Sequence, residues 1–133
     1  MKGVLTLFSE TDQIIFYGID NINESLEKII KSLGLENELF ELKLIMIEAV
    51  TNAFIHGNEK DSSKPIIMKW KLEEKFISIS VEYRGEYSEN LNFKKYIDEN
   101  NLLLENGRGL FIISSYSDEV KFEDGCIVIK KLL

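Results

Sequence analysis

The stretch IEAVTNAFIHGN, residues 47–58, is the most informative part of this chain, because it combines a strong helical pattern with three regularly spaced polar side chains. Glu48, Asn52 and His56 are four residues apart, so in an α-helix they stack along one side. Gly57 supplies a natural helix stop. Apolar residues at helical spacing predict a stripe that faces the core: Leu42, Ile45, Met46, Ala49, Val50, Ala53 and Phe54.

A helix this apolar is expected to be packed on most of its sides, which leaves little water for Glu48 and Asn52. Burying a carboxylate or a carboxamide costs free energy unless another group hydrogen-bonds to it. The pattern therefore predicts a polar ligand beside this helix. The simpler alternative is that Glu48 and Asn52 form a hydrogen-bonded pair that stabilises neighbouring backbone. His56 directly precedes the glycine stop, so it suits a C-terminal helix cap as well as it suits a pocket wall.

Length and charge limit what the ligand can be. With 133 residues, of which 44% are hydrophobic, residues 1–133 are expected to form a single domain. The formal net charge of −7 argues against nucleic acid or an anionic membrane as the main partner, since both require clustered positive charge. Cys126 is the only cysteine, and MKGVLTLFSETDQ holds no apolar stretch of signal-peptide length, so we expect a cytoplasmic protein.

The remaining pattern predicts strands paired in hairpins, with helices inserted between them. This order implies an α+β fold: a two-layer sandwich with a mixed, mostly antiparallel β-sheet, covered on one face by about three α-helices. In the first half of the chain, we expect strands 2–9 and 13–18 about the turn signal SETD, and then a helix from about Asn21 to Gly34, in which Glu24 is placed to complete a capping box. A second helix is expected from about Asn37 through the opening stretch. The second half should contain a hairpin of strands 66–72 and 77–83, a helix from Arg108 to about Ser117, and a last hairpin about Asp124-Gly125.

A glycine-rich turn is expected at the start of the helix that follows residue 107. Gly107 and Gly109 stand immediately before an apolar run, with Arg108 between them. Free backbone N–H groups and the positive end of the helix dipole would favour a phosphate at this position. A G-x-G pattern alone is a weak signal, however, and simple turn chemistry is the alternative.

Taken in this order, the motifs resemble the GHKL-type, or histidine kinase-like, ATPase domain. The resemblance is specifically to the bacterial anti-sigma-factor serine-protein kinases, and it runs from about Asp20 to Lys131. Its most specific element is E-x-x-x-N-A-x-x-H-G-N, present here as EAVTNAFIHGN at residues 48–58. The second element is GRGLFII at residues 107–113, which resembles the family's glycine box on the phosphate side.

The resemblance implies a role for each matching residue. Glu48 would be the catalytic general base, and Asn52 would be the metal ligand that coordinates the Mg²⁺ held by the nucleotide phosphates. Residues 87–106 would form a lid over the nucleotide. The residues expected to bind the nucleotide are Asn52, His56, Gly85, Gly107, Arg108, Gly109 and Leu110.

Two functions of different classes follow. The first is an ATP- and Mg²⁺-dependent protein serine kinase that phosphorylates an antagonist protein, binds a sigma factor and pairs as a homodimer through its sheet. The second is a non-catalytic protein-binding module with a degenerate nucleotide pocket. Tyr83 and Tyr87 favour the second, because they stand where the family has the adenine-binding Asp and a glycine.

Overall fold

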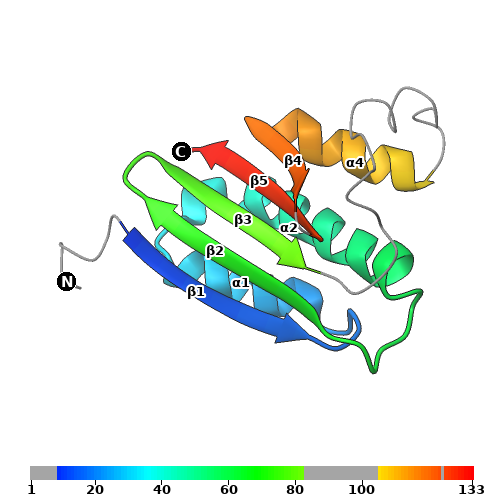
Figure 1. The fold of residues 1–133 in the computed structure, drawn as a ribbon. Coiled ribbons are helices and arrows are strands. Elements are labelled where there is room, and N and C mark those ends of the chain that lie inside the picture. The colour runs from blue at the N-terminus through cyan, green and yellow to red at the C-terminus, as the bar shows by residue number, and fades with distance from the viewer. Residues whose placement is uncertain (1–8, 83–104, 124) are drawn as a thin grey trace.

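The computed structural model describes residues 9–82, 105–123 and 125–133 of the chain. Within these residues, the chain forms five strands and three α-helices (Figure 1). The strands are β1 (Ser9–Phe16), β2 (Ile66–Glu73), β3 (Phe76–Glu82), β4 (Glu119–Glu123) and β5 (Cys126–Leu132). The helical segments are α1 (Ile22–Ser32), the 3₁₀ turn η2 (Glu36–Glu38), α2 (Leu39–Asn52), the π-helical turn η3 (Ala53–Gly57) and α4 (Glu105–Tyr116).

The five strands form one sheet in the order β1-β2-β3-β5-β4, and each of these pairings is antiparallel. The three α-helices lie together behind the sheet in Figure 1, so they cover a single face. This arrangement confirms the predicted α+β two-layer sandwich. Both predicted hairpins are present, β2 with β3 and β4 with β5, and Gly125 takes a φ of 76° in the second turn.

Residue alternation in the strands separates the two faces of the sheet. Met68 pairs with Val81 and Trp70 pairs with Ile79, and all four side chains are buried in the core. The residue between the first two, Lys69, is exposed on the opposite face. Because successive side chains point to opposite faces of a strand, one register places all four of these apolar residues under the helices.

Helix α2 lies in the middle of the helical layer, between α1 and α4. Its predicted apolar stripe is buried from Leu42 to Ala53, and Phe54 at its end is partly buried, which confirms the reading of the helical pattern. Packing on both flanks explains why this helix is apolar around much of its circumference. The buried residues of α2 are Leu42, Ile45, Met46, Ala49, Val50 and Asn52.

Two local predictions near the N-terminus were wrong. Residues 9–12, SETD, do not turn but lie inside β1, where Thr11 pairs with Lys71 of β2. Pairing along a neighbouring strand outweighs local turn chemistry here. Asn21 makes no side-chain cap at the start of α1, because its φ of 61° is left-handed rather than extended, so the capping box with Glu24 does not form.

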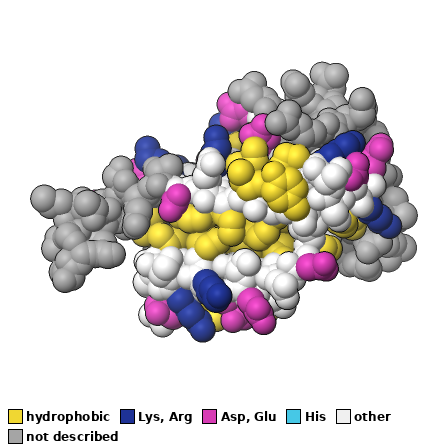
Figure 2. All heavy atoms as spheres, turned by 90° about the horizontal axis from the view of Figure 1, so that it is seen from below, with side chains coloured by type: hydrophobic (Ala, Val, Ile, Leu, Met, Phe, Trp, Pro, Cys, Tyr) yellow, Lys and Arg dark blue, Asp and Glu magenta, His cyan; other side chains and the backbone are white. Residues whose placement is uncertain are grey.

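Figure 2 views the molecule from the β1 edge and shows hydrophobic side chains gathered in a band along that edge. Ile15 of β1 is 44% exposed, and Tyr17, directly after the strand, is 63% exposed. Within the described part of the chain, no helix combines the length and apolar character needed to cross a membrane.

Candidate functional site

The predicted polar stripe of α2 faces the predicted glycine box of α4. A Cβ atom added to Gly109 would lie 2.8 Å from Glu48 Oε1. The same position is 3.6 Å from Asn52 Nδ2 and 3.7 Å from Asn52 Oδ1. Two motifs more than fifty residues apart in the sequence therefore meet at one place, where the absence of a side chain at Gly109 leaves room for both polar groups.

Asn52 is the unusual member of this cluster. Its side chain is only 7% exposed, and its Nδ2 has no hydrogen-bond partner among the described residues. An unpaired buried donor costs about 1–3 kcal/mol, so such groups are rare in folded proteins and call for an explanation. Its two amide atoms lie almost equally far from Gly109, so a flip of the amide would present oxygen instead of nitrogen toward α4.

The end of the site helix is not regular. The α-helical hydrogen-bond pattern of α2 ends at Asn52, and His56 lies in the π-helical turn η3 that continues it. Single π-helical turns are rare and are frequent at functional sites. The stacking predicted for Glu48, Asn52 and His56 therefore holds in regular α-helical geometry only as far as Asn52.

Asn58, which the sequence analysis left without a role, holds the chain in place after this turn. It is completely buried, and its Nδ2 donates to the carbonyl oxygens of Lys64 and Pro65, each at 3.2 Å. Its backbone N–H donates to Ala53 O at 2.8 Å, which closes the π-helical turn. In the sequence, Asn58 ends the motif at residues 48–58 and follows a helix stop, but neither position indicates which groups its side chain would bind.

The glycine box differs from the predicted geometry. Helix α4 begins at Glu105 rather than at Arg108, so Gly107 and Gly109 lie inside the helix and not in front of it. Gly109 is the fifth residue of α4, and in a regular helix its N–H is directed to the carbonyl of Glu105. Only the N–H groups of the first turn, Gly107 included, are left without a partner by the helical pattern. Leu110 is fully buried in the core and anchors this end of α4.

The remaining site predictions fall outside what the structure describes. Gly85, Tyr83 and Tyr87 lie outside the described residues. Most of the predicted lid at residues 87–106 also lies outside them, and its last two residues, 105 and 106, form the start of α4. The backbone of Arg108 belongs to α4, but its side chain is not among those described.

The donors in this cluster suit a metal that is held mainly by its substrate. The described residues contain no group of three or more His, Cys, Asp or Glu side chains that could hold a metal ion by themselves. Mg²⁺ in nucleotide sites is bound by one or two protein oxygen ligands together with substrate phosphates and water. The amide oxygen of Asn52 and the nearby Glu48 carboxylate are oxygen ligands of this kind, and the Asn52 Nδ2, which has no partner among the described residues, can donate to a phosphate oxygen.

Comparison with known proteins gives the same family as the motifs. The chain is 30% identical to the anti-sigma F factor of Lysinibacillus sphaericus over 98 residues, which cover 69% of this chain and 67% of that relative. It is 50% identical to the anti-sigma F factor of Clostridium perfringens over 54 residues, which cover 41% of this chain and 39% of the relative. The anti-sigma F factor of Anoxybacillus flavithermus is 31% identical over 86 residues, covering 63% and 59% of the two chains.

These alignments span between 39% and 67% of the relatives' own lengths. A family model described as the histidine kinase-like ATPase domain matches residues 19–130, which include α1, α2, η3, β2, β3, α4, β4 and most of β5. An ATPase domain indicates nucleotide binding. The chain therefore belongs to the histidine kinase-like ATPase domain family.

Proposed function

We propose that this protein binds Mg·ATP, transfers the γ-phosphoryl group to a serine of an antagonist protein, and also binds a sigma factor in the cytoplasm. Its relatives named anti-sigma F factor support the choice of partners. The meeting of Glu48 and Asn52 with Gly109 supports the choice of site.

Each residue has a defined task in this proposal. Asn52 supplies an amide oxygen to the Mg²⁺ that, when bound, neutralises charge on the phosphates. Glu48 accepts the proton of the attacking serine hydroxyl. The serine oxygen then bonds to the γ-phosphorus, and the bond from that phosphorus to the oxygen bridging it to the β-phosphate breaks. The products are phosphoserine, ADP and a protonated Glu48.

The observation that carries the proposal is the buried amide of Asn52, whose Nδ2 has no hydrogen-bond partner among the residues that the structure describes. A residue that is 7% exposed with such a donor costs stability in the isolated protein. Residues that bind ligands are often suboptimal for stability in this way. The proposal explains the cost, because a bound ligand would engage the amide.

Calorimetric titration with ATP and with GTP, each with and without Mg²⁺, tests the proposal. We expect Mg²⁺-dependent binding that prefers ATP, with loss of the metal dependence in Asn52→Ala. The matched control is Asn23→Ala, which removes an exposed amide from α1. Glu48→Gln should retain nucleotide binding and lose phosphoryl transfer. Equal affinity for nucleotide in Asn52→Ala and in the unmodified protein would contradict the proposed site.

Tyr83 and Tyr87 support a second candidate function, a protein-binding module without catalysis. A phenol cannot reproduce the hydrogen bond of a carboxylate to the adenine amine, and losing such a contact can cost several orders of magnitude in specificity. The titration separates the two functions. Absence of binding to either nucleotide at millimolar concentration, together with capture of a sigma factor that is unaffected by Glu48→Gln, would favour the binding module.

The proposal includes a homodimer that pairs through the sheet. The exposed Ile15 and Tyr17 at the β1 edge, and the hydrophobic band that Figure 2 shows along it, offer apolar surface for a second copy. Sedimentation of the unmodified protein and of Ile15→Lys tests this. A dimer that the substitution dissociates supports the assignment, and an unmodified protein that is monomeric at high concentration contradicts it.

A further inference from the structure

Helices α2 and α4 approach each other closely at two places, one toward each end of their contact. At one end, Glu48 of α2 lies against Gly109 of α4. At the other end, Glu41 of α2 and the carbonyl of Tyr116, the last residue of α4, share a single cation. Glu41 precedes Glu48 by seven positions, and Gly109 precedes Tyr116 by seven positions. Seven residues are about two helical turns, or about 10 Å, so the two places keep the same spacing on antiparallel neighbouring helices.

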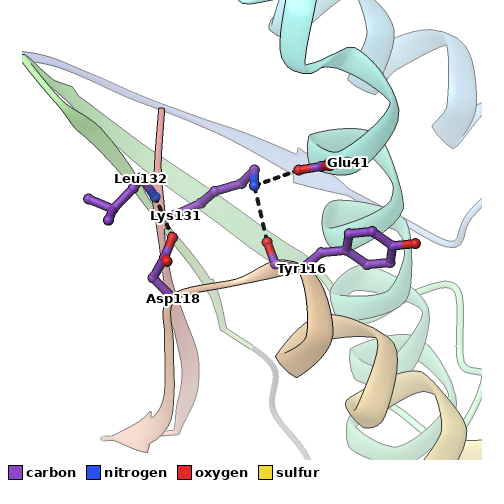
Figure 3. A network of polar contacts seen from close by, with 5 residues as sticks. All are labelled: Glu41, Tyr116, Asp118, Lys131 and Leu132. Atoms are coloured by element: carbon purple, nitrogen blue, oxygen red, sulfur yellow. Dashed lines mark hydrogen bonds and ion pairs between the residues drawn. The ribbon is translucent and has the colours of Figure 1, made fainter.

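The shared cation is Lys131 of β5. Its Nζ lies 2.7 Å from Glu41 Oε1 and donates to Tyr116 O at 3.2 Å (Figure 3). The Lys131 side chain is only 10% exposed, whereas that of Glu41 is 43% exposed. A buried ammonium group needs such partners, and the negative end of a helix dipole is a favourable place for it. The Lys131 side chain therefore connects strand β5 of the sheet to the first turn of α2 and to the last turn of α4.

The backbone on either side of Lys131 is fixed to the chain that leaves α4. Asp118 Oδ2 accepts a hydrogen bond from the Leu132 N–H at 2.6 Å, as Figure 3 shows. The Asp118 N–H donates to Lys130 O at 2.8 Å. These two bonds flank Lys131, so its Nζ is presented to Tyr116 from a backbone that cannot shift independently of the end of α4.

We propose that Lys131 is a positioning residue that sets the axial register of α4 on α2, and thereby the position of Gly109 against Glu48 and Asn52. A helix transmits an axial shift along its length, because its hydrogen bonds make it stiff over two turns. At Gly109 such a shift changes the approach to Glu48 directly, since a Cβ atom built there would lie 2.8 Å from Glu48 Oε1 and the carboxylate would have to move. The importance of this register for phosphoryl transfer rests on the proposed function, but the register itself does not.

The Lys131→Met substitution isolates the contribution of the ammonium group. Methionine preserves most of the buried apolar stem and removes the ion pair with Glu41 and the hydrogen bond to Tyr116. The matched control is Lys121→Met, because Lys121 also pairs with a glutamate, Glu123 at 3.4 Å, but on an exposed strand surface with both side chains more than half exposed.

Amide NMR spectra without nucleotide report on the register directly. We expect Lys131→Met to shift or broaden the Gly109 backbone amide and the Asn52 side-chain amide, whereas Lys121→Met should leave both unchanged. A purely local structural role for Lys131 would confine the changes to residues around Glu41 and Tyr116. Changes confined in that way, with Gly109 and Asn52 unperturbed, would overturn the proposal.

Glu41→Gln keeps the test decisive if Lys131→Met does not fold. It leaves the Lys131 ammonium group in place and removes only the negative charge of its partner Glu41, which is partly exposed. We expect the same two amides to move in the same direction by a smaller amount. If the Gly109 backbone amide and the Asn52 side-chain amide gave the same signals as in the unmodified protein, the proposal would again be overturned.

Nucleotide titration then separates this inference from the proposed function. If the unmodified protein binds Mg·ATP, Lys131→Met should weaken the affinity by about twofold to thirtyfold, the range expected for a residue that couples to a site without touching it. If the unmodified protein binds no nucleotide, the proposed function fails, while the amide shifts still decide whether Lys131 sets the register.

Discussion

Gly109 and Glu48 are in such close contact that a methyl group on Gly109 would lie 2.8 Å from the carboxylate oxygen Oε1. Normal contacts of a carbon atom are longer than this, so any larger residue at position 109 must displace the proposed general base. This contact joins the two motifs that the sequence separates, and it makes the site sensitive to changes in the packing of α2 on α4.

The first prediction concerns Gly109→Ala. Alanine in a helix interior gains about 0.5–1 kcal/mol over glycine, and the mobile end of Glu48 can move aside, so we expect the free energy of unfolding to change by less than about 1 kcal/mol. The displaced carboxylate should lower phosphoryl transfer by about tenfold or more, since a small misplacement of a catalytic group is costly. Ser115→Ala, at an exposed position of the same helix, is the control for both measurements. Unchanged transfer in Gly109→Ala would contradict the role assigned to Glu48.

The second prediction is that Asn52→Ala has little effect on stability when no nucleotide is present. The substitution removes a buried amide whose Nδ2 has no partner in the described part of the chain. The gain from deleting it offsets the lost packing, so the free energy of unfolding should change by less than about 1 kcal/mol. Urea denaturation in nucleotide-free buffer measures this. Destabilisation well beyond that range would indicate that Asn52 serves the fold rather than a ligand.

The third prediction is that Asn58→Ala, at the other buried asparagine, does lower the stability of the protein. Asn58→Ala leaves the carbonyl oxygens of Lys64 and Pro65 without their donor, so it should lower the free energy of unfolding by about 1–3 kcal/mol. The same denaturation experiment provides the comparison, because Asn52 and Asn58 are both asparagines and both buried. Equal effects of the two substitutions would refute the distinction drawn here between a ligand-binding amide and a structural one.

The fourth prediction concerns the pH dependence of the ion pair between α1 and α2. The Lys43 ammonium donates to Glu27, and this hydrogen bond, followed by the charge attraction between the two groups, lowers the pKa of Glu27 from its ordinary value of 4.5. A carboxyl whose pKa is lower in the folded state adds stability above pH 4.5, and this contribution is lost as the pH falls through the folded-state pKa.

Thermal denaturation of the unmodified protein and of Glu27→Gln across this pH range measures the effect. The melting temperatures should differ at neutral pH and converge below pH 4.5. Both side chains are partly exposed, so the difference at neutral pH should be small and should shrink with added salt. A gap that widens as the pH falls would show that the sign of the linkage is wrong.

Several features could be predicted from the sequence because their signals are local and repeated. The buried stripe of α2 follows from apolar residues at helical spacing, and the β2 and β3 hairpin follows from strict alternation about a polar turn. The spacing of Glu48 and Asn52 predicted a shared polar site, and both side chains do face Gly109. These features depend on the periodicity of residues that are close together in the sequence, so no distant partner is needed to recognise them.

Other features could not be predicted, because partners distant in the sequence decide them. The turn signal at residues 9–12 was overruled by pairing of β1 with β2, and the start of α4 was displaced by three residues from the position that the glycines indicated. Lys130 and Lys131 look equivalent in the sequence. In the structure, Lys130 Nζ lies 4.2 Å from the centre of the Phe76 ring, while Lys131 is buried against Glu41.

The amino-acid sequence by itself determined the order of the elements from α1 onward, the apolar faces of the central helix and the hairpin, and the family to which the chain belongs. The tertiary structure alone decided that Gly109 meets Glu48 and Asn52, and that Lys131 rather than Lys130 enters the helical layer. The physical reason is that a strand sends neighbouring side chains to opposite faces, so the pairing of β5 with β3 selects which lysine is buried.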